Sequence, residues 1–364
     1  MVEIADIFRL HGPEYRAQFG DRMLPSHLRA MQDIERCRTE MLGGQVYYCE
    51  TCREHHYSYH SCKNRHCPKC QNDQAQQWLE HQERLLLPVS HFMVTFTLPH
   101  ELRALARRHQ QVFYNILFRS SSEALQELAR DPRFIGGSIG MVGVLHTWTR
   151  DLRYHPHAHY IVPGGGLTAD GRWLPSRQDF LVPVKPLSVL FRAKFRDALQ
   201  KTDLFPLIDE QVWHKDWVVH CEPVGHAEEA FRYLAPYIFR VAISNNRILT
   251  LQEGSVTLQY KESATDAVKI CTLPAVEFIR RFLQHVLPAR FIKVRYYGLL
   301  SPTNRPLLNT ARELLDTGTV EADSTGHHRD RIEPAEAPSI PRCPTCGSPL
   351  ILVQTLRPKG RSPP

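Results

Sequence analysis

The residues with the clearest chemical potential are cysteines near the amino terminus. Six of the ten cysteines in this 364-residue chain lie between positions 37 and 70. A Cys-x2-Cys turn can place two thiolates on one ion, and two such turns complete the four-sulfur tetrahedron that suits structural Zn²⁺. Buried or redox-active thiols are the weaker interpretation, because packing needs far fewer cysteines. We therefore predict one structural zinc site made of Cys49, Cys52, Cys67 and Cys70.

Other potential zinc ligands accompany this set. Cys37, Cys62 and His66 could replace one of its members, or help to bind a second ion with nearby histidines. Near the carboxyl terminus, Cys343 and Cys346 form half a site, which either binds zinc with a distant partner or is inert. The sequence leaves both alternatives open for that pair.

A closed four-sulfur site leaves no coordination position for catalysis, so we expect the zinc module to contact nucleic acid or protein. Lys63, Arg65 and Lys69 lie between the ligands and could contact phosphates. A solvated, charged loop is the alternative interpretation for these three residues.

A second concentration of metal-binding residues is the segment HPHAHYIVPGGG, at positions 155–166. Residues i and i+2 of a strand face the same way, so His157 and His159 project together and form a platform for a divalent metal. If the polar stretch after Trp148 closes a hairpin, the preceding strand brings His146 roughly opposite His159. We prefer His146 as the third ligand and His155 as the second choice, over the alternative that these histidines are only core residues.

Such a metal would keep open positions, and it could polarise a phosphate group. A nucleophile beside it is then required. Tyr233 and Tyr237 lie four residues apart in FRYLAPYIFR, so a helix would place both hydroxyls on one face. Taken without the histidines, the pair would be better explained as a packed aromatic stripe.

The remaining sequence indicates how these groups are positioned. Residues 1–90 combine helical patterns with the Cys/His-rich segment, and residues 91–316 alternate strand-like and helical runs. Apolar runs at 139–148 and 156–162 predict the hairpin. We expect residues 317–364 to form a flexible, proline-rich tail that carries the Cys-x2-Cys pair.

Composition excludes several classes of protein. No apolar run approaches the roughly 18–20 residues that span a bilayer, and the first ten residues have no signal-peptide core. We expect a cytoplasmic protein, in which clustered Cys-x2-Cys pairs bind metal instead of forming disulfides. The formal net charge of +7 permits a polyanionic partner without requiring one.

Several motifs, in order, resemble the IS91 family of insertion-sequence transposases. These are SCKNRHCPKC, FTLPHELR, LHTW, HPHAHYIVPGGG, YLAPYIFRVAISNNRI and VRYYGLL, and the resemblance covers about residues 20–310. The family belongs to the HUH endonucleases, with His157 and His159 as the two histidines here. The resemblance implies an α+β fold in which helices flank a central antiparallel sheet, with a small amino-terminal zinc-binding domain.

The resemblance also implies an activity: metal-dependent nicking and rejoining of single-stranded DNA in rolling-circle-type transposition. Tyr233 and Tyr237 fit the two-tyrosine pattern. One attacks the scissile phosphate to form a 5′-phosphotyrosine, and Mg²⁺ or Mn²⁺ on the histidines activates that phosphate. The partners would be single-stranded DNA at the transposon ends and at the target, and Arg240 and Arg247 could follow its backbone.

Two other functions compete with this prediction. A plasmid replication initiator or relaxase would use the same chemistry, but the zinc module and the YLAPY context favour the transposase. In a non-catalytic, zinc-dependent DNA-binding protein, the strand with the histidines would only be part of the fold and would bind no catalytic metal. No P-loop of the form GxxxxGK[ST] is present, so we expect no built-in helicase.

Overall fold

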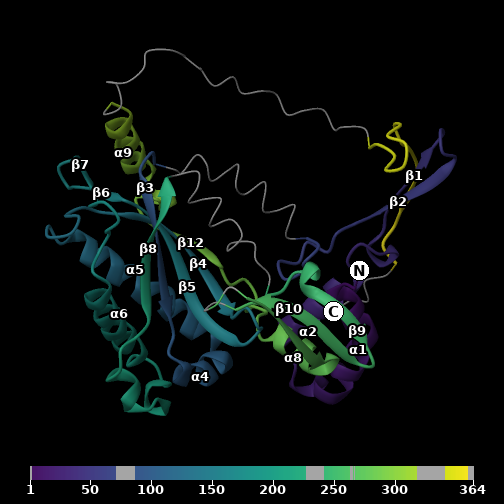
Figure 1. The fold of residues 1–364 in the computed structure, drawn as a ribbon, viewed down its shortest axis with the longest axis horizontal. Coiled ribbons are helices and arrows are strands. Elements are labelled where there is room, and N and C mark those ends of the chain that lie inside the picture. The colour runs from purple at the N-terminus through teal and green to yellow at the C-terminus, as the bar shows by residue number, and fades with distance from the viewer. Residues whose placement is uncertain are drawn as a thin grey trace.

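A computed structural model describes residues 2–70, 87–226, 242–262, 265, 267–317 and 341–359. Its centre is a five-stranded antiparallel sheet in the order β12-β4-β5-β3-β8. The strands are β3 (Ser90–Thr97), β4 (Gly140–Trp148), β5 (Tyr154–Pro163), β8 (Val219–His226) and β12 (Val294–Gly298). The predicted hairpin is therefore present as β4 and β5, joined by the turn at 149–153 (Figure 1).

Helices cover one face of this sheet. They are α4 (Arg103–Arg108), α5 (Gln110–Arg130) and α6 (Val184–Leu199), and α5 and α6 lie beside each other on the same side of the strands (Figure 1). Phe96 and Tyr160 point from the sheet into this layer, where their rings meet at 5.7 Å and Phe191 of α6 packs on Phe96 at 5.0 Å. Buried aromatic area of this kind dominates the stability of such a core.

The strand alternation that buries Phe96 and Tyr160 sends their neighbours to the other face. Val94, Phe96 and Leu98 are fully buried, whereas Thr95 and Thr97 are half-buried. Successive residues of a strand point to opposite faces. One face of the sheet thus packs on the helices, and the other carries polar side chains such as Thr95 among buried apolar ones such as Val144.

A second hydrophobic core joins the two halves of the chain. Helices α1 (Ile4–Phe19) and α2 (Pro25–Arg36) pack with α8 (Ala275–Leu283) and with the sheet β9 (Ile248–Gln252), β10 (Ser255–Lys261) and β11 (Val268–Pro274). Phe8 and Phe282 meet edge to face at 5.2 Å. The amino-terminal helices therefore share their core with residues 242–286 instead of building one of their own.

A third unit projects at the edge of the molecule (Figure 1). It is a small antiparallel sheet in the order β13-β1-β2, formed by β1 (Gly44–Cys49), β2 (Glu54–Tyr59) and β13 (Ile351–Leu356). Residues 341–359 were expected to be flexible, and the structure corrects this for that segment, because β13 is paired with β1 along its length. Residues 318–340 and 360–364 lie outside the described residues.

The remaining strands of the described residues are β6 (Gly165–Leu167) and β7 (Trp173–Pro175), which form a two-stranded sheet, and the remaining α-helix is α9 (Arg305–Thr317). Short 3-10 helices lie between several of these elements. The α+β class with a central antiparallel sheet is confirmed. None of the helices in the described part of the chain is both long enough and apolar enough to cross a membrane.

Burial of His91 on β3 predicts a pH dependence of stability. The side chain is 1% exposed, its Nδ1 donates to the Val89 carbonyl at 2.8 Å, and burial lowers its pKa from 6.5 to about 4. As the pH falls, His91 is protonated in the unfolded chain near pH 6.5 and in the folded chain only near pH 4. The stabilisation present above pH 6.5 is therefore lost as the pH falls toward 4. Between pH 7 and pH 5 the loss from this residue is about 2 kcal/mol.

The measurement is urea unfolding of the wild type and of His91→Gln at both pH values. The wild type should lose about 2 kcal/mol more between pH 7 and pH 5 than the variant does, because glutamine does not titrate there. Equal losses in the two proteins would contradict this origin.

Candidate functional site

Three histidines converge on the face of the central sheet opposite α5 and α6, where His146 and His159 are 3% and 7% exposed. His146 comes from β4, and His157 and His159 come from β5. One ring nitrogen of each lies within 4.8 Å of one from each of the others. Their ring centroids are separated by 4.7 Å for His157 and His159, 4.9 Å for His146 and His159, and 5.5 Å for His146 and His157. The structure thus brings together the three predicted ligands of the catalytic metal.

The strand register that unites them differs by two residues from the expected one, which placed His146 opposite His159. His146 is paired directly with His157, and Val144 is paired with His159. The ladder shifts between His146 and Trp148, where a bulge adds a residue to one strand. His146 still reaches His159, because diagonal neighbours on one face remain within reach of long side chains.

Hydrogen bonds hold the ligand rings in place. Nδ1 of His157 donates to the carbonyl of His155 at 2.7 Å, which leaves Nε2 as the lone-pair nitrogen of the neutral ring. Nδ1 of His159 is 2.9 Å from Oγ1 of Thr95 on the adjacent strand β3. Burial lowers the pKa of His157 to about 4, so this imidazole is neutral near pH 7 and can coordinate a cation.

Thr95 is therefore expected to position a metal ligand. The Thr95→Val variant removes the hydroxyl but keeps the shape of the side chain, and we expect about 10- to 100-fold weaker Mn²⁺ binding. Titration of the protein with Mn²⁺, followed by electron paramagnetic resonance, measures the affinity. Thr97→Val, the same change two residues along β3, should weaken binding much less, and equal losses would contradict a specific role for Thr95.

The surroundings of the cluster are aromatic and basic. Trp148 stacks on His146 with ring centroids 4.7 Å apart, and Nζ of Lys293 lies 5.4 Å from the centre of the same indole ring. Burial lowers the pKa of Lys293 to about 7. His155, the second choice as third ligand, lies 5.2 Å from His157 by ring centroids but is outside the group of three that could share an ion.

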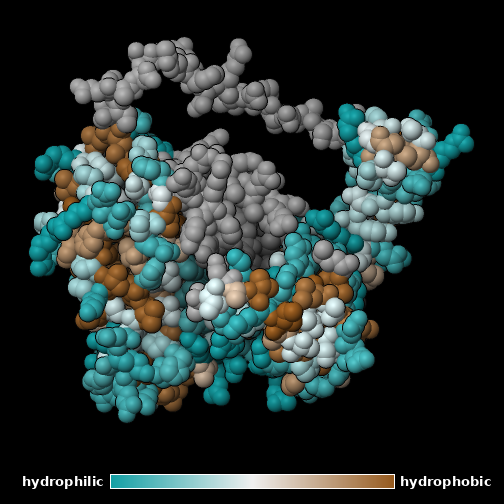
Figure 2. Space-filling model, in the orientation of Figure 1, coloured by the Kyte–Doolittle hydropathy of each residue, from teal (hydrophilic) through white to brown (hydrophobic). Residues whose placement is uncertain are grey.

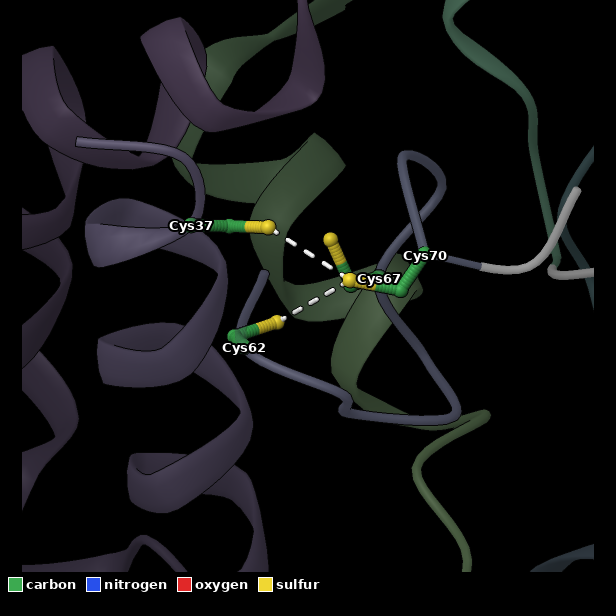
Figure 3. Close-up of side chains that lie close together, drawn as sticks. All are labelled: Cys37, Cys62, Cys67 and Cys70. Atoms are coloured by element: carbon green, nitrogen blue, oxygen red, sulfur yellow. Dashed lines mark hydrogen bonds between the residues drawn. The ribbon is translucent and has the colours of Figure 1, made fainter. Parts of the chain in front are cut away.

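Four cysteines meet at the end of α2. Cys37, Cys62, Cys67 and Cys70 point toward one another (Figure 3), with ligand atoms within 4.8 Å. The sulfur of Cys70 is 3.5 Å from that of Cys37 and 3.6 Å from that of Cys62. Zinc–sulfur bonds of about 2.3 Å place tetrahedral sulfurs about 3.8 Å apart, so this cluster has the dimensions of a zinc site.

A second group of four contains Cys49, Cys52, Cys343 and Cys346, again with ligand atoms within 4.8 Å. It lies in the projecting sheet, and half of it comes from the carboxyl-terminal segment. All ten cysteines lie in the described residues and are free thiols, so neither group contains a disulfide.

The single predicted zinc site is thus corrected. Cys49 and Cys52 do not meet Cys67 and Cys70, because each pair is completed by other cysteines. The spare candidates Cys37 and Cys62 belong to the first group. His66 belongs to neither group, since its Nε2 accepts a hydrogen bond from the Leu287 backbone at 3.3 Å.

The residues predicted to bind DNA lie in different environments in the structure. Arg65 donates to the carbonyls of Phe291 and Pro288, so its guanidinium links the cysteine-rich segment to the chain that follows α8. Lys69 pairs with Glu3 at 2.5 Å, and Arg247 donates to the carbonyls of Gln259 and Arg150. Lys63 is exposed. The DNA contacts of these residues stay a prediction.

Three predicted site residues, Tyr233, Tyr237 and Arg240, lie outside the described residues. The described chain ends at His226, the last residue of β8, and resumes at Ala242 in the second hydrophobic core. The role of the tyrosines as nucleophiles therefore stays a prediction from the sequence.

Comparison with known proteins places these clusters in a family. Residues 140–306 match a family model described as "Putative transposase", and residues 7–98 match one described as "Transposase zinc-binding domain". The first range contains the three histidines, and the second contains the six amino-terminal cysteines.

Two relatives cover most of the chain. A protein of Sinorhizobium fredii named "Putative transposase y4qJ" is 39% identical over 94% of this chain and 92% of its own length. The "Transposase for insertion sequence element IS801" of Pseudomonas savastanoi pv. phaseolicola is 29% identical over 73% of this chain and 68% of its own. The chain therefore belongs to the IS91 family of transposases and carries that family's zinc-binding domain.

Proposed function

We propose that this transposase nicks and rejoins single-stranded DNA through a 5′-phosphotyrosine intermediate, in rolling-circle-type transposition. The observation that supports the proposal most strongly is the convergence of His146, His157 and His159 on one face of the sheet. Three imidazoles can hold a divalent cation and leave positions for water and phosphate oxygens. A bound Mg²⁺ or Mn²⁺ would supply Lewis-acid activation of the scissile phosphate.

The covalent step would proceed on a tyrosine hydroxyl. The oxygen of Tyr233 or Tyr237 attacks the phosphorus, its proton passes to solvent or to a nearby base, and the 3′-oxygen of the neighbouring nucleotide leaves. The products are a 5′-phosphotyrosine and a free 3′-hydroxyl. The new bond remains a phosphodiester, so the same 3′-hydroxyl or another strand can reverse the step without an external energy source.

The surroundings fit a nucleic-acid substrate. The indole of Trp148 lies beside His146, and the amine of Lys293 lies near that indole. Basic side chains neutralise phosphates, and aromatic rings stack on unpaired bases. In this proposal the substrates are DNA at the transposon ends and at the target, and the protein acts in the bacterial cytoplasm on DNA of the nucleoid. The Cys37, Cys62, Cys67 and Cys70 cluster of the zinc-binding domain holds structural Zn²⁺.

The test is the capture of the covalent intermediate. Wild-type protein is incubated with 5′- or 3′-labelled single-stranded oligonucleotides from a transposon end and Mn²⁺, then denatured and separated by electrophoresis. We expect a protein–DNA adduct that carries the 3′ label only, because the 5′-phosphate stays on tyrosine. The Tyr233→Phe/Tyr237→Phe double variant should form none, and an adduct that survives in it would refute the nucleophile assignment.

A further inference from the structure

The two ends of the chain build the projecting sheet together. Strand β13 pairs with β1 from Gly44 opposite Leu356 to Tyr48 opposite Ile351. Two side-chain contacts reinforce the pairing: Oγ1 of Thr51 donates to Oγ of Ser348 at 3.0 Å, and Nζ of Lys359 lies 2.6 Å from a carboxylate oxygen of Glu40. Residues 341–359 are thus part of a folded unit with the amino-terminal hairpin.

This unit has almost no hydrophobic core. Its buried cluster consists of Cys49, Cys343 and Leu350, so two of its three buried members are cysteines. Ile351, Leu352 and Val353 of β13 remain 47–51% exposed. In the view of Figure 2 the surface over this unit is largely hydrophilic. A sheet this small needs a cross-link to be stable, and a structural metal is one such cross-link.

The two Cys-x2-Cys turns have matching backbone geometry. The amide of Arg53, directly after Cys52, donates to the Cys49 carbonyl at 2.7 Å, and the amide of Gly347, directly after Cys346, donates to the Cys343 carbonyl at 2.8 Å. Both following residues have positive φ, 59° for Arg53 and 77° for Gly347. Each turn therefore presents two sulfurs on one side, and the turns face each other as a pair.

The distances between the sulfur atoms also fit a single zinc ion. Sγ of Cys49 is 3.6 Å from Sγ of Cys346, and Sγ of Cys52 is 3.9 Å from Sγ of Cys343. These separations match the edge of about 3.8 Å expected for sulfurs around one zinc ion. His56 stands next to the group, with Nε2 3.4 Å from Sγ of Cys343.

We propose that Cys49, Cys52, Cys343 and Cys346 bind a Zn²⁺ ion of their own, separate from the Cys37–Cys70 cluster, and that this ion clamps the carboxyl-terminal segment onto the amino-terminal hairpin. The family's zinc-binding domain match stops at residue 98, so it contains only half of this site. The assignment gives Cys343 and Cys346 a partner, and it does not depend on the proposed cleavage chemistry.

Zinc stoichiometry tests the site itself. Full-length wild type should contain two zinc ions per chain by mass spectrometry of the metal. Cys343→Ser/Cys346→Ser and Cys49→Ser/Cys52→Ser should each contain one, and the variant that combines all four changes should still contain one. The double changes guard against His56 replacing a single lost thiolate. Cys271→Ser, outside both clusters, should keep two.

Two zinc ions in the Cys343→Ser/Cys346→Ser protein would overturn the proposal. The proposal would also be overturned if each double variant lost one zinc ion and the variant with all four changes lost two. The two cysteine pairs would then bind different ions.

The clamp is tested without changing any cysteine. A protease recognition sequence is inserted between Ser324 and Thr325, and the purified zinc-loaded protein is cleaved. We expect the carboxyl-terminal fragment to co-elute with the rest of the chain in size-exclusion chromatography and to separate after a chelator removes the zinc. Separation while zinc is bound, or co-elution after both ions are gone, would overturn the clamp.

Discussion

Replacing His157 by alanine is expected to slow the cleavage of single-stranded DNA by about a thousandfold or more. The side chain contributes one of three nitrogens within 4.8 Å, and its neutral state makes it a ready ligand. Without it, two imidazoles remain for the cation, and the charge that develops on the phosphate loses most of its stabilisation. Single-turnover cleavage of a labelled oligonucleotide at saturating protein and fixed Mn²⁺ measures the rate.

His220 provides a matched control for this variant. It lies on β8 opposite Thr95, on the same face of the sheet as the cluster, but its side chain is 62% exposed. His220→Ala should cleave within about threefold of the wild-type rate, as is usual for exposed positions.

Measuring DNA binding distinguishes the loss of metal coordination in His157→Ala from damage to the fold. The His157→Ala protein should bind the same oligonucleotide in the absence of metal as tightly as the wild type, because only metal coordination is lost. Normal cleavage by this variant would refute the metal site, and loss of metal-free DNA binding would indicate a damaged fold instead.

Cys70→Ser is expected to release one zinc ion and to destabilise the amino-terminal helices by several kcal/mol, because the binding free energy of a structural zinc is also folding free energy. Cys37, Cys67 and Cys70 are all at most 3% exposed and belong to the core that α1 and α2 share with α8. Loss of the ion would leave a buried hydroxyl among unpaired thiols inside that core.

Urea unfolding with metal analysis of the same samples measures both effects. Cys271→Ser on β11 is the matched control, since Cys271 packs against the same core but lies outside both clusters. It should keep its zinc and lose about 1 kcal/mol or less. A Cys70→Ser protein with wild-type zinc content and stability would contradict the assignment.

Much of the histidine site is predictable from local sequence. The period of two in a strand places His157 and His159 on one face wherever the strand lies, and the turn residues after Trp148 indicate the hairpin that adds His146. The bulge near Trp148 was not predictable, because one extra residue in a ladder leaves no clear mark in the sequence. Thr95 was also missed, since only the pairing of β3 with β5 brings it to His159.

Arg65 shows the limit of reasoning from residue type. A basic residue between metal ligands predicts a phosphate contact, which stays a prediction, but residue type gave no sign that its guanidinium donates to the backbone carbonyls of Pro288 and Phe291. These carbonyls are more than 200 positions away in the sequence. Buried backbone carbonyls need hydrogen-bond donors, and which basic side chain provides them depends on the tertiary structure.

The sequence by itself determined the chemistry of this protein: thiolate pairs at Cys-x2-Cys spacing, two imidazoles on one strand face, and an α+β frame to hold them. The tertiary structure alone decided which pairs share a site. Spacing within a turn sets the direction of two neighbouring side chains, but every Cys-x2-Cys pair is chemically equivalent, so any two can complete a tetrahedron. Strand β13 pairs with β1, and this brings Cys343 and Cys346 to Cys49 and Cys52, while α2 brings Cys37 to Cys67 and Cys70. Such long-range choices depend on the path of the whole chain, which local residue patterns do not encode.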